Sequence, residues 1–426
     1  MARYFYSAFF YLIMPLILLR LFYRASKAPA YGRRIAERFG FFTVPELENT
    51  IWVHAVSVGE TIAAAPLVKR LQQQYPEASI VVTTMTPTGS DRVRALFGDS
   101  VFHVYAPYDL PGSILRFIKR LQPKLLVIME TELWPNTIHY CRRCSIPVVL
   151  ANARLSAKSA AGYRRLGWLT RPMLNNLTQV VAQNRADADR FLALGLADSK
   201  VVVSGSIKFD VVIEGALIRK AQALKYQWSD QGQRLIIIAA STHQGEDNII
   251  LEAFEQVIAT IPNALLIIVP RHPERFEHVT KLCEERFSIA RRSQSDSVCA
   301  ATQVLVGDTM GELLLLYGCA DIVFVGGSLI NSGGHNMLEP AAWSLPLLTG
   351  NSDFNFAEAS RLLQQRSALL IANDAASLAK KMIVLAQSET LRLEMGTNAK
   401  AVVAENRGAL DRLSAVVQGY YSDKSP

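Results

Sequence analysis

The sequence lacks the short motifs that define several large enzyme classes. It has no G-x-x-x-x-G-K-[ST] phosphate loop, no G-x-G-x-x-G dinucleotide fingerprint, no G-x-S-x-G nucleophile elbow and no H-E-x-x-H metal motif. These absences argue against a P-loop nucleotide hydrolase, a standard dinucleotide oxidoreductase, an α/β-hydrolase and a zincin-type metalloprotease. Any phosphate-binding or catalytic function must therefore rest on other residues.

A metal site is not expected either. The spacing of Asp187 and Asp189 matches the D-x-D motif of metal-dependent sugar transferases. Both lie in a predicted helix, RADADRFLALG, where acids in the first turn interact favourably with the helix dipole. Cys141 and Cys144 form a lone C-x-x-C without a second, suitably spaced pair of ligands. The sequence thus predicts a reaction without a metal, in which arginine, lysine and helix ends neutralise the charge of the leaving group.

Cysteine and charged residues are both scarce. The five cysteines are scattered through 426 residues, and this odd number favours a reducing compartment. Charged residues make up 19% and hydrophobic residues 50%, which indicates a globular chain, long enough for two domains. The net charge of +8 favours acidic partners such as nucleotide phosphates or anionic lipids. Nucleic acid is not expected, because no aromatic-interleaved basic stripe or recognition motif is present.

A charge-free stretch occupies residues 4–19, YFYSAFFYLIMPLILL. It is slightly shorter than the roughly 20 residues that span a bilayer, and six basic residues follow it by position 38. By the positive-inside rule these keep the rest of the chain cytoplasmic, whereas a signal peptide carries its charge before the apolar segment. We predict a membrane anchor over residues 1–25. Whether it spans the bilayer or lies in the interface is left open, because Pro15 interrupts it.

Apolar runs of strand length alternate with helix-like segments through the rest of the chain. The runs are 51–56, 80–84, 101–105, 125–129, 148–151, 180–182 and 201–203, then 235–239, 265–269, 289–290, 304–306, 322–325, 345–348 and 369–371. Such alternation predicts α/β structure with parallel sheets covered on both faces. We predict two doubly wound, Rossmann-like domains, residues 26–212 and 213–426, the second ending in helices. Ligands are expected at the carboxyl ends of the strands and in a cleft between the domains.

Charged residues that follow strands of the first domain are candidates for catalysis. Glu60 opens a helix, where it is either a general base or a partner of the helix dipole. A base role requires partial burial or a neighbouring acid to raise its pKa, and Glu130 is suited to the second task. Glu130 and Glu132 lie beside Trp134 directly after a buried strand, which packing does not explain. Lys208 closes the domain and either faces the cleft or is simply solvated.

Two turns of the second domain are suited to phosphate. Residues 241–246, STHQGE, follow an apolar run and are able to cap a helix and hold an anion. Arg271 follows the next run and offers a forked cation, with His272 as a further donor. A third turn, residues 307–313 (GDTMGEL), is placed to present its backbone to the edge of a base.

A glycine loop follows the apolar run 322–325. Gly326, Gly327, Gly333 and Gly334 allow the backbone to approach a ligand closely. A helix expected to begin near Met337 would present unpaired N–H groups to an anion. Glu339, in its first turn, is either an acceptor for ribose hydroxyls or a partner of the helix dipole. With the other turns, this loop predicts that the second domain binds a nucleotide.

Seven segments, in this order, resemble the 3-deoxy-D-manno-octulosonic acid (Kdo) transferases of lipid A assembly. They are HAVSVGE, ETELWPN, SIKFD, STHQGE, PRHPERF, DTMGEL and GGHNMLEPAAW. The resemblance covers nearly the whole chain and implies a GT-B glycosyltransferase fold. It also implies CMP-Kdo as donor, no separate cofactor, and a tetra-acylated, bis-phosphorylated disaccharide lipid as acceptor. The reaction would take place at the cytoplasmic face of the inner membrane.

The resemblance also implies roles for individual residues. Glu60 would be the base of an inverting displacement, and Glu130 and Lys208 would support the transition state. The residues implied in CMP contact are Arg271, His272, Thr309, Met310, Gly311, His335, Asn336, Met337, Leu338 and Glu339. Two positions depart from the family pattern, since Ser206 stands where asparagine is usual and Ser344 where glycine is usual. Neither change removes a charged group.

Two other functions are compatible with parts of this pattern. A nucleotide-sugar 2-epimerase shares the fold, but it would need no lipid anchor, so the N-terminal segment argues against it. A membrane-tethered nucleotide-sugar sensor would need no catalytic groups, so Glu60, Glu130 and Lys208 argue against that. The number of Kdo units added, the acyl pattern accepted and the oligomeric state do not follow from the sequence.

Overall fold

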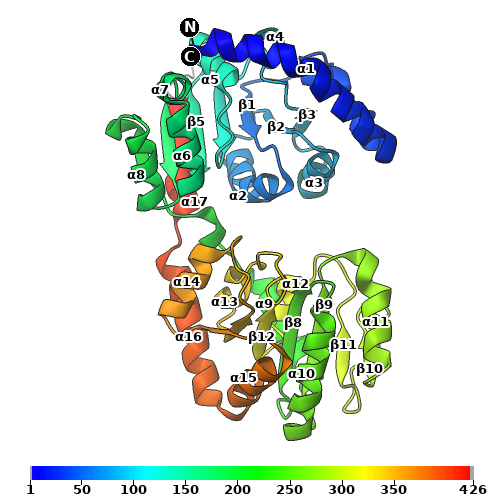
Figure 1. The fold of residues 1–426 in the computed structure, drawn as a ribbon. Helices are drawn as coiled ribbons and strands as arrows, with labels where there is room; N and C mark the ends of the chain where they lie inside the picture. The colour runs from blue at the N-terminus through cyan, green and yellow to red at the C-terminus, as the bar shows by residue number, and fades with distance from the viewer. Residues whose placement is uncertain (1, 423–426) are drawn as a thin grey trace. The chain divides into compact units, whose positions relative to one another are not determined.

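The computed structural model describes residues 2–422 and divides the chain into two compact units. Unit 1 contains the described residues up to Asp210 together with those from Arg407 onward, and unit 2 is Val211–Asn406. Each unit is built on a seven-stranded parallel sheet with helices packed on it (Figure 1). The predicted pair of doubly wound domains is confirmed.

The sheet of unit 1 has the strand order β3-β2-β1-β4-β5-β6-β7. Its strands are β1 (Ile51–His54), β2 (Ile80–Thr84), β3 (Phe102–Tyr105), β4 (Leu125–Met129), β5 (Val148–Ala153), β6 (Gln179–Ala182) and β7 (Val201–Val203). Its α-helices are α1 (Ala2–Lys27), α2 (Val58–Gln74), α3 (Pro87–Phe97), α4 (Pro111–Leu121), α5 (Pro135–Arg143), α6 (Ala157–Arg165), α7 (Gly167–Asn175), α8 (Arg185–Ala193) and α17 (Ala409–Ser422).

The sheet of unit 2 has the order β10-β11-β9-β8-β12-β13-β14. Its strands are β8 (Ile236–Thr242), β9 (Leu265–Pro270), β10 (Ile289–Arg291), β11 (Val304–Val306), β12 (Ile322–Val325), β13 (Leu347–Thr349) and β14 (Leu369–Ile371). Its α-helices are α9 (Gly215–Trp228), α10 (Asp247–Thr260), α11 (Phe276–Glu284), α12 (Leu313–Tyr317), α13 (Leu338–Ala342), α14 (Ala357–Gln365), α15 (Ala375–Gln387) and α16 (Glu389–Glu405).

The strand order reverses between β1 and β4 in unit 1 and between β8 and β12 in unit 2, where β11 also lies between β9 and β10. The connections that leave the two strands at each of these points run toward opposite edges of the sheet. The loops at the carboxyl ends of the two central strands therefore diverge and leave room for a ligand. These two switch points are where the geometry of an open parallel sheet places a binding site.

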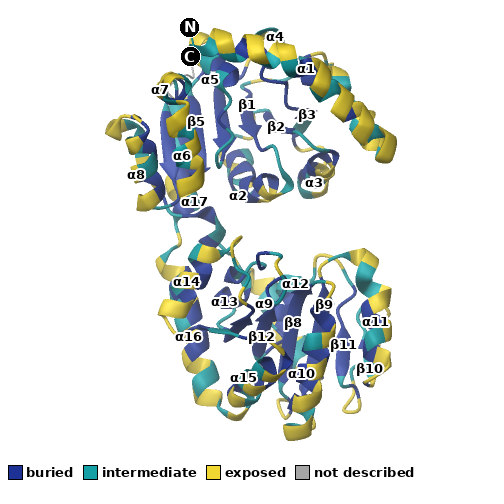
Figure 2. Cartoon of the chain, in the orientation of Figure 1, coloured by how far each residue is buried: buried dark blue, intermediate teal, exposed yellow. Residues whose placement is uncertain are grey.

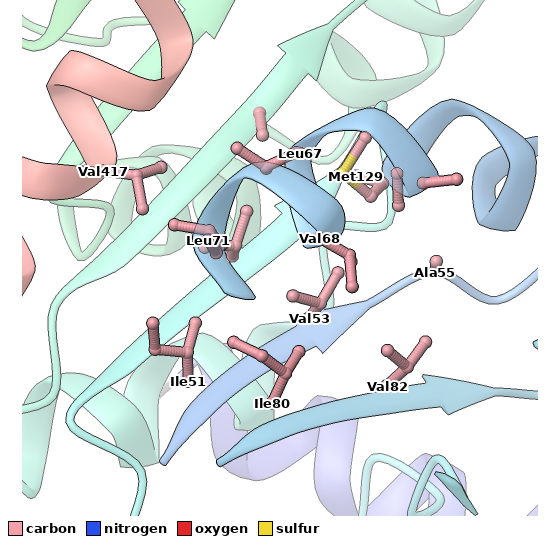
Figure 3. Close-up of a cluster of buried hydrophobic side chains, with 14 of the residues drawn as sticks. Ile51, Val53, Ala55, Leu67, Val68, Leu71, Ile80, Val82, Met129 and Val417 are labelled. Atoms are coloured by element: carbon pink, nitrogen blue, oxygen red, sulfur yellow. The ribbon is translucent and has the colours of Figure 1, made fainter. Parts of the chain in front are cut away.

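Strand β1 shows why the sheet is buried on both faces. Ile51 and Val53 pack on one side against α2, together with Leu67 (Figure 3). Trp52 points to the other side, where its ring lies 4.7 Å from that of Phe117 in α4. Fully burying one such aliphatic side chain stabilises the fold by roughly 1.5–3 kcal/mol. Polar chemistry is thereby confined to the ends of the strands.

The last helix, α17, belongs to unit 1. Its Val417 lies in the cluster formed by β1, β2 and α2 (Figure 3). The Asp210 carboxylate accepts hydrogen bonds from the amides of Gly408 and Leu410, each 2.6 Å long. The sequence-based division assigned residues 213–426 to the second domain, and the structure moves their last helix to the first. Helical periodicity shows that a helix packs on a core, but not on which one.

Helix α1 lies along the surface of unit 1 with a narrow stripe turned inward (Figure 2). Its buried residues are Ser7, Met14 and Leu21, and Met14 packs on Tyr108 and Leu110 before α4. The opposite face is exposed and apolar. Large side chains on it include Phe5, Phe9, Leu12, Leu16, Leu19 and Phe22. The length and composition of α1 are sufficient to cross a membrane, and the helix extends slightly beyond the predicted segment 1–25.

Replacing Ser344 by glycine should stabilise unit 2. Ser344 has φ +60°, a left-handed conformation that costs a residue with a Cβ roughly 1–2 kcal/mol. Glycine removes that strain but gives the unfolded chain more freedom, which offsets about 0.4–1 kcal/mol. We expect Ser344→Gly to raise the unfolding free energy by about 0.5–1 kcal/mol, measured by urea denaturation. A lower midpoint in the variant would contradict this account.

Candidate active site

Glu60 lies in the first turn of α2, which follows β1 at the switch point of unit 1. Its amide donates to the Ser57 hydroxyl (3.2 Å), which caps α2. The same hydroxyl donates to Glu60 Oε1 (2.6 Å), and the Val56 amide donates to Oε2 (2.9 Å). The side chain is only 7% exposed. The carboxylate is therefore fixed by its own turn and not free in solvent.

Burial raises the pKa of Glu60 to about 7. The hydrogen bonds from Ser57 and Val56 oppose this rise, while the charges of Glu132 and Glu130 add to it. The required increase in pKa thus comes mainly from desolvation, and Glu132 contributes more than Glu130. A carboxylate with a pKa near neutrality is matched to proton transfer at physiological pH.

Glu130 and Glu132 follow β4, across the switch point from Glu60. Glu130 has φ +55° and its amide donates to Ala151 O (3.0 Å). Its Oε2 lies 3.8 Å from Nε of Arg154. Burial raises the pKa of Glu132, although the indole of Trp134 donates to its Oε2 (3.1 Å). A left-handed non-glycine residue two positions from a half-buried acid is typical of a functional loop.

His54, at the end of β1, is not a candidate base. Burial lowers the pKa of its imidazole to about 3, so the ring is neutral. Its Nδ1 lies 2.9 Å from the Thr83 hydroxyl, and its ring packs edge-on against Trp134 with centroids 4.6 Å apart. His54 therefore supports the indole that binds Glu132. The sequence pattern pointed to Glu132 and Trp134 but not to this contact.

Lys208 lies at a different part of the same edge of the sheet, where β7 ends. It lies in a 3-10 turn after β7 and is half-buried. Its amide donates to the Ser206 hydroxyl (3.4 Å), and the amide of Ile207 donates to Oδ1 of Asn152 at the end of β5 (3.3 Å). Two strands separate β7 from β4. The backbone of Lys208 is thus set apart from the switch point that brings Glu60, Glu130 and Glu132 together.

In unit 2 the carboxylate of Glu246 lies beneath the glycine loop. It is fully buried and accepts four backbone N–H groups. Those of His243 and Gly327 bind Oε2 (3.0 and 2.7 Å), and those of Ser328 and Leu329 bind Oε1 (2.9 Å each). The glycine loop was expected to bring its backbone close to a ligand. At Gly327, Ser328 and Leu329 the backbone amides bind an internal carboxylate instead.

Three imidazoles and one guanidinium gather at the switch point of unit 2. Nε2 of His243 lies 2.7 Å from Nε2 of His335, and the ring of His272 packs edge-on against His243 at 5.3 Å. Burial lowers the pKa of His335 to about 4, and the nearby charges of His243 and Arg271 lower it further. Gly327 is required here, because an added Cβ would lie 2.8 Å from the His335 ring. The cluster is suited to bind an anion. A bound negative charge would raise the pKa values of the imidazoles again and so favour their protonated forms.

Arg271 and His335 had been predicted at this site, together with His272. The sequence signal for His243 was weaker, because the STHQGE turn was expected to use its capping hydroxyls and amides. Among the described residues, no hydrogen bond joins the exposed guanidinium of Arg271 to another side chain. It is therefore available to a ligand.

Glu339 lies in the first turn of α13, close to this cluster. Burial raises the pKa of its carboxyl, while Asn336 and the charge of Arg271 lower it. Asn336 Nδ2 donates to Oε1 (2.9 Å), and Asn336 Oδ1 accepts the amide of Leu338 (3.0 Å). Within the part of the chain described, only Asn336 hydrogen-bonds this carboxylate. Its second oxygen is suited to accept hydroxyl groups of a ligand.

The remaining predicted contacts lie in the turn after β11. The Thr309 hydroxyl donates to Glu312 Oε2 (2.7 Å), and Arg292 binds both oxygens of Glu312 (3.0 and 2.8 Å). Gly311 has φ +85°, and Met310 is 61% exposed. Because its threonine hydroxyl is already used, this turn can offer a ligand its backbone and the methionine side chain.

The D-x-D pair of α8 takes part in structural contacts. Asp187 accepts the amide of Leu155 (2.9 Å) and an N–H of Arg190 (3.0 Å). Asp189 pairs with Arg185 at 2.9 Å. These acids are therefore held by the protein, as their place in the first turns of a helix indicates.

A depression of about 460 Å³ opens at the carboxyl ends of β12, β13 and β14. Its lining residues are Ser328, Leu329, Ile330, Asn331, Asn351, Ser352, Asp353, Phe354, Ala372 and Asn373. The lining mixes hydroxyl and amide groups with apolar side chains, as is common in small-molecule sites. Sequence analysis missed it, because its residues come from three loops without a common spacing.

Two Rossmann-like units, each built on a seven-stranded parallel sheet, form a GT-B-like fold. A solved glycosyltransferase from Rickettsia africae has a TM-score of 0.55 at 16% identity, over 88% of this chain and 98% of that one. The UDP-GlcNAc 2-epimerase of Neisseria meningitidis has a TM-score of 0.55 at 15% identity, over 88% and 100%. At such low identities these similarities show the fold alone.

The sequence comparisons show the family. A family model described as 3-deoxy-D-manno-octulosonic-acid transferase (kdotransferase) matches residues 33–211. The chain is 46% identical to the Haemophilus influenzae 3-deoxy-D-manno-octulosonic acid transferase over 99% of both chains. It is 35% identical to the Bordetella pertussis transferase over 94% of this chain and 95% of that one. The chain belongs to the Kdo transferase family and is a glycosyltransferase. The predicted family is confirmed, and the epimerase and sensor alternatives are not supported.

The raised pKa of Glu60 predicts a specific pH dependence of stability. The carboxyl takes up its proton near pH 7 in the folded protein but near its ordinary value of 4.5 when unfolded. Between these values the folded state binds more protons, so Glu60 lowers stability as pH rises from about 4.5 to about 7. Relative to Glu60→Gln, the unfolding free energy of the wild type should fall by up to about 1.4 kcal/mol per pH unit in this window.

Urea denaturation at several pH values measures the difference. Glu46→Gln is the control for the loss of a carboxylate, because Glu46 is exposed in the same unit. A difference between the wild type and Glu60→Gln that does not change with pH would contradict the raised pKa of Glu60.

Proposed function

We propose that this Kdo transferase uses CMP-Kdo as donor and the tetra-acyl disaccharide precursor of lipid A, lipid IVA, as acceptor. The reaction is a single, inverting displacement without a metal ion. Unit 1 activates the acceptor and unit 2 holds the donor. The observation that carries this proposal is Glu60, a buried carboxylate at a switch point whose pKa is raised to about 7 by burial.

Glu60 is the proposed general base. It takes the proton of the acceptor hydroxyl while that oxygen bonds to the anomeric carbon of Kdo. The bond from this carbon to the CMP phosphate breaks, and its electron pair leaves with CMP. Attack from the face opposite the leaving group inverts the configuration. Glu130 and Lys208 are proposed to support the transition state, and Glu132 helps to keep the pKa of Glu60 high.

The donor site is proposed at the switch point of unit 2. Arg271 and the imidazoles of His272 and His335 bind the phosphate and receive the charge that develops on it. Asn336 orients Glu339, whose carboxylate accepts the ribose hydroxyls. The other proposed contacts with CMP come from Thr309, Met310, Gly311, Met337 and Leu338.

The acceptor is a membrane lipid in this proposal, and α1 provides the attachment to the cytoplasmic side of the inner membrane. The inward stripe with Met14 and Leu21 packs on unit 1, so a helix crossing the bilayer would lose these contacts. We therefore place α1 in the interface, with its apolar outer face in lipid. The exposed Arg20, Arg24 and Lys27 at its end suit anionic headgroups.

Donor binding should depend on two charged groups of unit 2. A hydrogen bond to a charged group contributes ~1.5–3 kcal/mol, so Arg271→Ala and Glu339→Gln should each weaken CMP binding roughly 10- to 100-fold. Isothermal titration calorimetry with CMP measures this. Arg361→Ala, an exposed substitution on α14, is the matched control and should bind CMP like the wild type. Unchanged affinity in both site variants would place the nucleotide elsewhere.

The activity is tested by incubating the protein with CMP-Kdo and the lipid acceptor in detergent and weighing the products by mass spectrometry. We expect an increase of one or more Kdo units, unaffected by EDTA. Glu60→Gln should bind CMP normally but lose roughly 10²–10⁴ in kcat, the usual contribution of a general base. Retention of more than about a tenth of the rate would remove Glu60 from this role. Loss of transfer in EDTA would contradict the metal-free reaction.

A further inference from the structure

The first two turns of α1 make directional polar contacts with the start of α5. Arg3 donates from Nη1 to Oδ1 of Asn136 (3.0 Å), and the Ser7 hydroxyl donates to the same oxygen (3.1 Å). The Tyr6 side chain is half-buried and lies close to the carboxylate of Asp109, in the loop before α4. The charge of this carboxylate adds to the raised pKa of the phenol. These contacts differ from the rest of the helix, where apolar residues such as Met14 pack without directional bonds.

Asp109 and Asn136 form the centre of this network. The Asp109 carboxylate accepts the amides of Asn136 (2.9 Å) and Thr137 (2.7 Å) and so caps α5 from a distant loop. Asn136 Nδ2 returns a hydrogen bond to Asp109 O (2.6 Å). Asp109 is 3% exposed, Asn136 0% and Ser7 6%. Buried polar groups cost free energy unless they are hydrogen-bonded. Removal of α1 would take from Oδ1 of Asn136 the hydrogen bonds that Arg3 and Ser7 donate.

The start of α5 is also the end of the loop that carries the site acids. Trp134 is the cap residue of α5 and lies two positions before Asn136. Its indole donates to Glu132 and packs on His54, as described above. Glu132 in turn adds to the raised pKa of Glu60. A shift of Asn136 is therefore expected to move the indole of Trp134 and the carboxylate of Glu132 to which the indole donates.

An anchor needs an apolar surface, but it needs no hydrogen bonds to the loop beside the catalytic residues. We propose that the first two turns of α1 are a positioning element of the active site. Tyr6 and Ser7 act as positioning residues that hold Asp109 and Asn136, and through them the loop of Glu130 and Glu132. The effect on catalysis rests on the function proposed above, whereas the effect on the loop does not.

The experiment compares two double variants of the full chain that remove the same atoms from the same helix. Tyr6→Phe/Ser7→Ala removes the hydroxyls that reach the loop. The control, Tyr11→Phe/Ser26→Ala, removes an exposed phenol and an exposed serine hydroxyl that, like that of Ser7, bonds to a carbonyl within the helix. Each protein is measured for flotation with vesicles, for kcat and KM on CMP-Kdo and detergent-dispersed lipid IVA, and for amide hydrogen exchange in residues 130–137.

We expect Tyr6→Phe/Ser7→Ala to float like the wild type but to lose roughly 10-fold in kcat, since misplacement by 1 Å can cost 10²-fold. Its KM should change little, the pH midpoint of kcat/KM should shift, and amides 130–137 should exchange faster. The control should match the wild type in every measurement.

Wild-type kcat and wild-type exchange in Tyr6→Phe/Ser7→Ala would overturn the inference. So would a loss of flotation with kcat retained, which would make these residues part of the anchor alone. If the wild type itself transferred no Kdo, the proposed function would fail, and hydrogen exchange would still decide whether α1 positions the loop.

Discussion

Burial of both faces of the two parallel sheets is the constraint on which the rest of this structure depends. The central strands β1 and β8 place every side chain in a core, so they offer no free surface on which to build a site. Polar groups are left to the loops at the strand ends, and the reversal of strand order selects two of those loops in each unit. These loops and the helical turns that follow them carry Glu60 and Glu132 in unit 1, and His243 and His335 in unit 2.

Desolvation is the common cause of the unusual proton affinities at both switch points. It raises the pKa of Glu60 and Glu339, and it lowers the pKa of His335. In each case the group becomes less charged than it would be in water. Burial therefore prepares a carboxylate to accept a proton in unit 1 and neutral imidazoles to meet an incoming negative charge in unit 2. The same desolvation thus raises the pKa of carboxyl groups and lowers the pKa of imidazoles.

Much of the fold could be predicted because buried parallel strands have a strong local signature. Each predicted apolar run corresponds to a strand, and the polar residues directly after β1, β4, β9 and β12 include those that the structure brings together. Contacts between distant segments could not be predicted in this way. The carboxylate of Glu246 under the glycine loop, the pairing of His243 with His335, and the seat of α17 on unit 1 depend on which loops and cores meet. The spacing of residues along the sequence does not predict these contacts.

The attachment of α17 to unit 1 has a consequence for how the chain is made. Unit 2 is a continuous insert, whereas unit 1 needs both ends of the polypeptide. During synthesis from the N-terminus, every residue of unit 2 is available before the last helix, which supplies Val417 to the core around β1. Domains fold as units while the chain emerges. Unit 1 must therefore wait until all of unit 2 has been made before α17 can pack beside α2 and complete its core.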